Sequence, residues 1–92
     1  MDKLAKLELM DKISRELEDL ANSQTSVLKK IGQIEADNIN LGMQMLDKKL
    51  GELYERVDGS LNIVTELSEN FTQERTTFYT KNNMASLEDP TA

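Results

Sequence analysis

The side chains of this 92-residue chain that could do chemistry are carboxylates, amines, amides and hydroxyls, because the sequence contains no cysteine and no histidine. The lack of histidine removes the commonest general base and the commonest transition-metal ligand, and the lack of cysteine removes disulfides, thiol nucleophiles and thiolate metal sites. The four glycines are scattered singly, so no glycine-rich loop can hold a phosphate. A short chain also has little room for a pocket. The sequence therefore predicts a protein that is not an enzyme and binds no cofactor and no metal.

Carboxylates outnumber arginines in the second half of the chain. They are Glu52, Glu55, Asp58, Glu66, Glu69 and Glu74, set against Arg56 and Arg75. A helical row of carboxylates can imitate the phosphate spacing of nucleic acid and so inhibit an enzyme that binds DNA or RNA. Charge on a helix is more often a solvated face, and the interspersed arginines weaken the field. The sequence favours the solvated face, and the acidic inhibitor is the alternative.

Net charge and hydropathy argue against nucleic acid and membranes as direct partners. The chain has 17 acidic and 11 basic residues, a net charge of −6, and no cluster of basic residues that could neutralise phosphates. No run approaches the roughly 20 apolar residues of a membrane-spanning helix. The N-terminal MDKLAKLELM carries charges throughout and lacks the apolar core of a signal peptide. We therefore expect a cytoplasmic protein, or one incorporated into a larger assembly such as a virion.

Apolar residues in the first half recur at alternating steps of three and four, the spacing of a coiled-coil seam on a helix. One line of this first seam is Met10, Leu17, Gln24 and Ile31, and the other is Ile13, Leu20, Val27 and Ile34. Acidic residues four positions before basic ones, such as Asp11 before Arg15, also favour a helix. The pattern predicts a helix over residues 3–36.

The second half carries a second seam with the same repeat. One line is Met43, Leu50, Val57, Val64, Phe71 and Phe78, and the other is Leu46, Leu53, Ser60, Leu67 and Glu74. The repeat weakens at the threonines of residues 76–80, and two asparagines follow at 82 and 83. The pattern predicts a helix over residues 43–81, within a single domain of residues 1–83, and a flexible tail of residues 84–92.

The two seams are out of register with each other across residues 37–42. Either the chain turns there, or one continuous helix presents two apolar faces. The segment DNINLG contains an aspartate, two asparagines and a glycine, which are typical of the turn in an αα-hairpin. Its Ile39 and Leu41 would be exposed in a turn, which favours the continuous helix. The turn chemistry weighs more, so the hairpin is the preferred fold.

Five further residues each have two interpretations. Gln24 and Asn38 fall on the first seam, where a polar side chain can fix register and oligomer number. We interpret Asn38 as a turn residue, whereas for Gln24 a register role and simple partial exposure are equally supported. Phe71, Phe78 and Tyr79 either anchor a partner or continue the core. Phe71 and Phe78 keep the heptad step, and Tyr79, with Phe78 next to it, is the candidate for an external contact.

The combined interpretation is an all-α protein whose two long amphipathic helices form a coiled coil or helical bundle by self-association. Burial against another helix has to supply the stability of such helices. The predicted function is structural or adaptor-like, through helix packing against protein partners and further copies of the chain, as in accessory components of phages, plasmids or secretion systems. The residues expected to carry assembly are Ile13, Leu17, Leu20, Ile31, Leu46, Leu50, Leu53, Val57, Val64, Leu67 and Phe71.

A small helical secretion substrate or its chaperone is a further alternative. The YERVD segment at residues 54–58 resembles the tyrosine-acid tail signal of small WXG-type secreted proteins, which are short hairpins without cysteine. In this chain the segment falls within a predicted helix, and the turn tryptophan of that family is absent. The resemblance covers these few residues alone.

Overall fold

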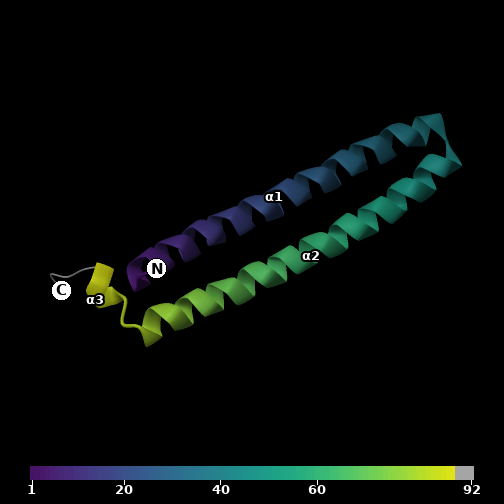
Figure 1. The fold of residues 1–92 in the computed structure, drawn as a ribbon. Coiled ribbons are helices and arrows are strands. Elements are labelled where there is room, and N and C mark those ends of the chain that lie inside the picture. Colours follow the sequence, from purple (N-terminus) through teal and green to yellow (C-terminus); the bar gives the residue numbers. More distant parts are fainter. Residues whose placement is uncertain (89–92) are drawn as a thin grey trace.

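The protein is a long helical hairpin. A computed structural model describes the backbone of residues 1–88 and the side chains of residues 1–86. Helix α1 spans Lys3–Leu41, α2 spans Gln44–Lys81, and the short α3 spans Ala85–Glu88. α1 and α2 lie side by side and antiparallel (Figure 1), and residues 1–88 contain no strand. The all-α prediction and the preference for a hairpin over a continuous helix are both confirmed.

Side-chain contacts fix how the two helices are aligned. Near the termini, Arg75 Nε donates to Asp11 Oδ1 at 2.7 Å, and in the middle Gln24 Nε2 donates to Ser60 Oγ at 2.8 Å. The residue numbers of the two pairs add up to 86 and 84. Two residues, one on each helix, therefore lie at the same level along the hairpin when their residue numbers add up to 84–86.

The turn is shorter than the sequence predicts. α1 continues through residues 37–41, so the predicted break is wrong for those five residues, and the chain reverses over Gly42 and Met43 alone. Gly42 ends α1 in the left-handed conformation, with φ 72°, which glycine adopts without steric cost. Its N–H donates to the carbonyl of Asn38 at 2.6 Å. Ile39 and Leu41 are helical but remain 82% and 64% exposed.

Asn38 lies inside α1, so its assignment to the turn is wrong. The side chain is 2% exposed and reaches the turn from the helix. Its Oδ1 accepts from the N–H of Met43 at 3.1 Å, and its Nδ2 donates to Met43 O at 3.0 Å and to Asp47 Oδ1 at 2.8 Å. Met43 itself provides no side-chain cap for α2. The Asn38 amide therefore satisfies the backbone of the turn and fixes the start of α2 against the end of α1.

The contact between α1 and α2 runs along two lines of residues on each helix, spaced seven apart, which we call the inner seam. On α1 the lines are Leu7, Ser14, Ala21, Leu28 and Glu35, and Met10, Leu17, Gln24, Ile31 and Asn38. On α2 they are Leu50, Val57, Val64, Phe71 and Phe78, and Leu61, Ser68 and Arg75, the second line being continued by Asn82 just after the helix. All of these side chains are buried or half-buried. One predicted line of each helix therefore lies in the inner seam.

The other predicted line of each helix lies at one edge of the inner seam instead. Leu20, Val27 and Ile34 are 44%, 41% and 44% exposed, and Leu53 and Leu67 are 46% and 49% exposed. Each of these residues comes one position before a residue on the heptad line of Ala21 on α1 or of Leu61 on α2, which belongs to the inner seam. In the hairpin these side chains therefore do not pack fully between α1 and α2, because the contact is rotated around each helix relative to the apolar stripe.

The apolar core is small, and its last member lies beyond α2. The buried apolar side chains among the described residues are Leu7, Ile31, Leu50, Val64 and Met84. Asn83 adopts a left-handed φ of 50° after α2, and the fully buried Met84 donates its N–H to the carbonyl of Tyr79 at 3.0 Å. Buried packing therefore extends into the segment predicted to be a tail, of which residues 89–92 lie outside the described residues.

Candidate protein-interaction surface

An exposed apolar strip runs along one long side of the hairpin. It consists of Leu20, Val27 and Ile34 of α1 and Leu53 and Leu67 of α2, and we call it the apolar flank. Their exposure of 41–49% leaves nearly half of each side chain in water. Single exposed aliphatic residues are normal on a protein surface, but an aligned set is typical of a surface that binds another protein.

The α1 and α2 members of the apolar flank face the same side of the hairpin. In an antiparallel helix pair, equivalent positions beside the seam meet across the same edge. Ser60 stands seven residues from both Leu53 and Leu67, so the three share one line of α2. Its hydroxyl accepts the hydrogen bond from Gln24 of α1 at 2.8 Å. This line of α2 therefore borders the contact with α1 on the side of the flank.

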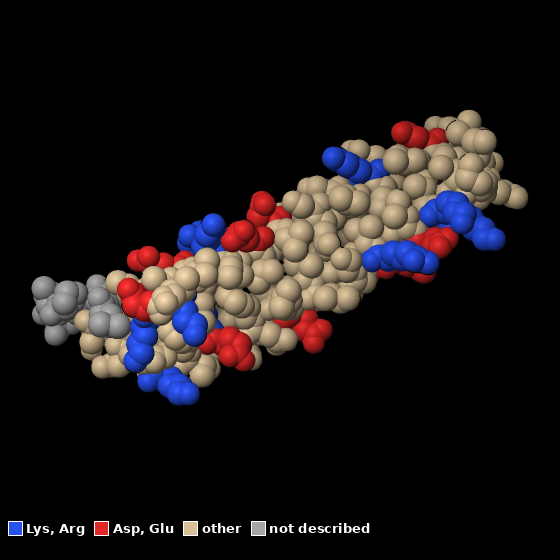
Figure 2. Space-filling view, in the orientation of Figure 1, with Lys and Arg blue, Asp and Glu red and all other residues tan. Residues whose placement is uncertain are grey.

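Charged residues border the apolar flank. Glu16 and Lys30 lie beside it on α1, and Lys49 and Arg56 lie beside it on α2, all exposed. Ile63, 67% exposed, widens the apolar strip on α2. Figure 2 shows a face of the hairpin where charged side chains gather along the edges and ends, while a band without charge runs over both helices. An apolar centre with a polar border is the usual composition of a protein interface.

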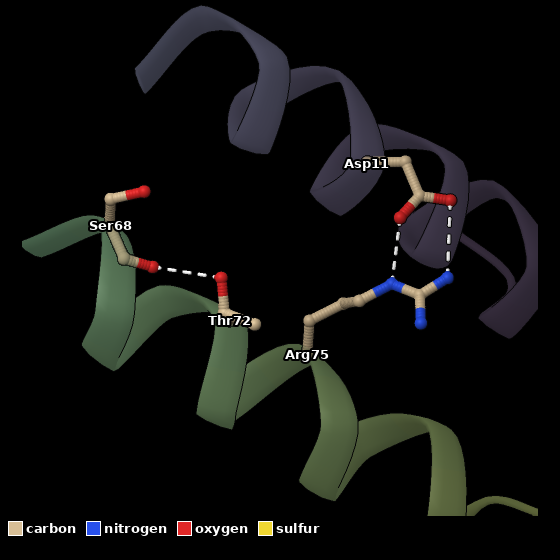
Figure 3. A network of polar contacts seen from close by, with 4 residues as sticks. All are labelled: Asp11, Ser68, Thr72 and Arg75. Carbon is tan, nitrogen blue, oxygen red and sulfur yellow. Dashed lines mark hydrogen bonds and ion pairs between the residues drawn. The ribbon is translucent and has the colours of Figure 1, made fainter. Parts of the chain in front are cut away.

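The opposite side of the hairpin is polar and is held by an ion pair. Arg75 directs Nε and a terminal nitrogen at the two carboxylate oxygens of Asp11, at 2.7 and 3.3 Å (Figure 3). The side chains are 29% and 37% exposed, so water screens the attraction in part. The guanidinium also lies 5.3 Å from the ring centre of Tyr79. These contacts join the two helices near the open end of the hairpin.

An open groove of about 600 Å³ lies on this polar side. Its lining residues are Ser14, Glu18, Ala21, Asn22, Thr65, Ser68, Glu69, Thr72 and Gln73. Ser14, Ala21 and Ser68 belong to the inner seam, and their small side chains leave space where larger ones would meet. The Thr72 hydroxyl donates to the carbonyl of Ser68 at 2.9 Å, within its own helix (Figure 3). The groove is therefore an open trough between polar and small side chains.

Polar side chains interrupt the inner seam along its whole length. They are Ser14, Gln24, Glu35 and Asn38 of α1, Ser68 and Arg75 of α2, and Asn82 at the end of α2. Gln24 is half-buried and bonds across the helices, and its Oε1 is buried without a hydrogen-bond partner. A buried acceptor without a partner lowers the stability of the folded state. The inner seam is therefore less apolar than the flank beside it.

The predicted assembly residues are distributed over two surfaces. Those in the inner seam are Leu17, Ile31, Leu50, Val57, Val64 and Phe71. Those on the apolar flank are Leu20, Leu53 and Leu67, with Ile13 and Leu46 half-buried on the same lines. Phe78 and Tyr79, expected as external contacts, are half-buried, and their rings lie near Lys6 and Arg75. The part that each residue plays in assembly stays a prediction.

Four apolar residues that matter in the structure were not singled out from the sequence as core or assembly residues. Leu7 and Leu28 share a line of the inner seam, Ile63 widens the flank, and Met84 is buried after α2. Leu7 and Leu28 are 21 residues apart, which is three heptads. A serine and an alanine occupy the two positions between them, so the repeat is hard to recognise.

Neither metal binding nor membrane crossing finds support in residues 1–88. Within this part of the chain, no three carboxylates come together to hold a metal ion. No helix there is both long and apolar enough to cross a membrane. No family model, curated protein or solved structure matches the chain. The surfaces of the hairpin are therefore the basis for its proposed function.

Proposed function

We propose that this is a non-enzymatic structural or adaptor protein that works by packing its helices against protein partners, with the apolar flank as its binding surface. The observation that carries the proposal is the alignment of five half-exposed aliphatic side chains on one side of both helices. Removing apolar surface from water is favourable by about 25 cal/mol per Å². A partner that covers the strip gains from all five side chains at once.

The composition of the inner seam supports the same proposal. Polar or small residues occupy much of its length, and few apolar side chains are buried in the described part of the chain. Long helices in so short a chain depend on packing for their stability. A partner on the flank supplies apolar burial that the inner seam lacks.

The arrangement of charge favours packing over imitation of nucleic acid. A phosphate-like surface needs an unbroken row of negative charge. On α2, Lys49 and Arg56 interrupt the acidic residues, and both lie within ion-pair distance of Glu52, at 3.6 and 3.2 Å. The charge beside the flank is therefore mixed in sign, as at the border of a protein interface.

The proposal is tested by placing charge on the flank. In the purified full-length chain, the double substitution Leu20→Asp and Leu67→Asp is expected to abolish association, because burying an unpaired carboxylate costs several kcal/mol. Both positions are about half exposed in the hairpin, so helicity should be retained. Light scattering reports association and circular dichroism reports helicity. Chemical cross-linking in the native cells is carried out on the same variants.

The matched control is Ile39→Asp, which places the same charge at an aliphatic position that is 82% exposed and lies off the flank. This variant is expected to associate like the natural chain. If the flank variant still associates in solution and in cells, the flank is not the binding surface. A natural chain that is monomeric and cross-links to nothing would refute the adaptor function itself.

A further inference from the structure

We infer that the apolar flank binds a second copy of this chain, antiparallel to the first, so that two hairpins form a four-helix bundle. The inference rests on the proposed function, because it assigns the occupant of the same flank. In this bundle α1 lies against α1 of the second copy, and α2 lies against its α2. A two-fold axis crosses the bundle near the level of Gln24 and Ser60.

The direction of the apolar stripe on each helix is the first argument. On α1 the stripe has the lines of Leu17 and Leu20, whereas the inner seam has the lines of Leu17 and Ala21. At about 100° per residue, the centre of the stripe points about 50° away from the inner seam, toward the flank. The stripe on α2, with the lines of Leu50 and Leu53, is turned to the same side. In a square bundle, the direction to the centre lies about 45° from each neighbouring helix. Both stripes therefore point to the centre of a bundle rather than at each other.

The spacing of the flank along the hairpin is the second argument. On α1, Leu20 and Val27 lie at equal distances from a midpoint between residues 23 and 24, and on α2, Leu53 and Leu67 lie at equal distances from Ser60. The hydrogen bond between residues 24 and 60 puts the two midpoints at one level. A two-fold interface packs a surface against itself, so its two halves must match. Rotation about this level brings Leu20 to Val27 of the second copy, and Leu53 to its Leu67.

Charge beside the flank selects the antiparallel orientation. Glu16 and Lys30 lie on one exposed line of α1, each seven residues from position 23. The two-fold rotation therefore brings Glu16 to Lys30 of the second copy, twice in each dimer. In a parallel pair of hairpins, α1 would face α2 of the second copy, and residues at the same level would again have numbers that add up to 84–86. Lys30 would then repel Arg56, while Asp37 would attract Lys49, so the two effects would cancel. The antiparallel pair has attraction alone at these positions.

The exposed surface is large enough for such a dimer. The chain exposes 7046 Å², whereas a compact monomer of 10.4 kDa exposes about 5,400 Å². A stable interface of standard size buries about 800 Å² on each partner. The flank from residue 13 to residue 34 is about 32 Å long, and two helices side by side are about 20 Å wide. A second hairpin therefore covers a strip of about 640 Å², within the range of roughly 600–1,000 Å² per partner for interfaces of standard size.

The first test uses the full-length chain, whose lack of cysteine lets one introduced thiol report a single position. Light scattering is expected to give twice the chain mass of 10.4 kDa. Ser23→Cys lies at the axis, so a thiol cross-linker that spans about 10 Å should join two copies through α1. Ser26→Cys, which faces away from the second copy, is the matched control and should not cross-link. A dimer that fails to cross-link at residue 23 overturns the antiparallel arrangement.

The second test reverses charge without touching the apolar residues. Glu16→Lys should weaken the dimer about tenfold, because it places lysines opposite each other at two symmetric positions. Adding Lys30→Glu should restore the natural dissociation constant to within about threefold, since the reversed pair is again attractive. Analytical ultracentrifugation measures both constants. Failure of the second substitution to rescue the first contradicts the contact.

The two proposals fail in different ways. If the purified chain is monomeric while the flank controls a complex in native cells, the second copy is not the occupant and the adaptor function stands. If neither a dimer nor a cellular complex depends on the flank, both proposals fall. A closed assembly of more than two copies also overturns the inference.

Discussion

The two long sides of the hairpin belong to the same two helices, yet they differ in what they offer another protein. One side carries the apolar flank, with Leu20, Val27 and Leu53 half exposed. The other side carries an open groove with Thr65 and Thr72 at its border. Side chains one position before the inner seam are mainly large and aliphatic, whereas those one position after it are mainly small or polar.

This difference between the two sides shows how a simple hairpin can limit the number of copies that associate. A hairpin with apolar residues on both sides could add copies on each side and form an open stack. With the aligned apolar strip on one side alone, covering that side leaves no comparable strip for a further copy, and growth would stop. If copies associate through the flank as proposed, the polar side, with its groove and its ion pair, limits assembly as well as holding the hairpin.

The largest expected effect comes from making the polar side resemble the flank. Glu18→Leu, Thr65→Leu and Thr72→Leu together place three aliphatic side chains around the groove. Each can contribute about 1.5–3 kcal/mol when another protein buries it. The triple variant should therefore form species larger than those of the natural chain at the same concentration, as measured by light scattering.

A matched control separates the position of these leucines from their hydrophobicity. Ser26→Leu, Gln33→Leu and Asn62→Leu introduce the same number of leucines at exposed positions that face outward. This control should keep the natural mass, because the new side chains form no strip beside the seam. If both triple variants form assemblies of the same increased mass, the position of the leucines on the hairpin does not control association.

The heptad repeat predicts which lines of each helix are apolar, but it does not say which lines meet in the hairpin. Each helix has three adjacent lines near the contact, represented on α1 by Leu17, Leu20 and Ala21. The repeat marks the first two as the stripe, whereas the hairpin uses the first and the third. Where the neighbouring helix lies is tertiary information that the spacing within one helix does not contain.

The turn shows a similar limit on a smaller scale. The segment 37–42 contains the end of α1, and glycine at 42 marks the reversal. The sequence assigns Asn38 to the turn because asparagine is common in turns. The same amide can instead bond to the turn from inside the helix, as its contacts with Met43 and Asp47 do. Composition locates the turn but does not distinguish these two uses of an asparagine.

An intermediate effect is expected from removing the polar contact between the two helices. Gln24→Leu with Ser60→Ala deletes one hydrogen bond and also the buried Oε1 that has no partner. Replacing both partners by apolar groups is neutral or stabilising, so the free energy of unfolding should rise by up to about 1 kcal/mol. Urea unfolding followed by circular dichroism measures it. The exposed Gln33→Leu serves as control, and a loss of stability specific to the double variant would show that the contact fixes the alignment.

The smallest effect belongs to the ion pair on the polar side. Asp11→Asn removes the charge but keeps the shape, and the pair with Arg75 is short, two-pronged and partly exposed. Such a pair contributes roughly 0.5–1 kcal/mol, and salt reduces it. The unfolding free energy should therefore fall by about that amount in dilute buffer and by less in 1 M salt. Glu52→Gln, in the exposed pair with Arg56, should change it by less. Equal losses for the two variants would mean that the contact between the helices adds nothing beyond a surface pair within one helix.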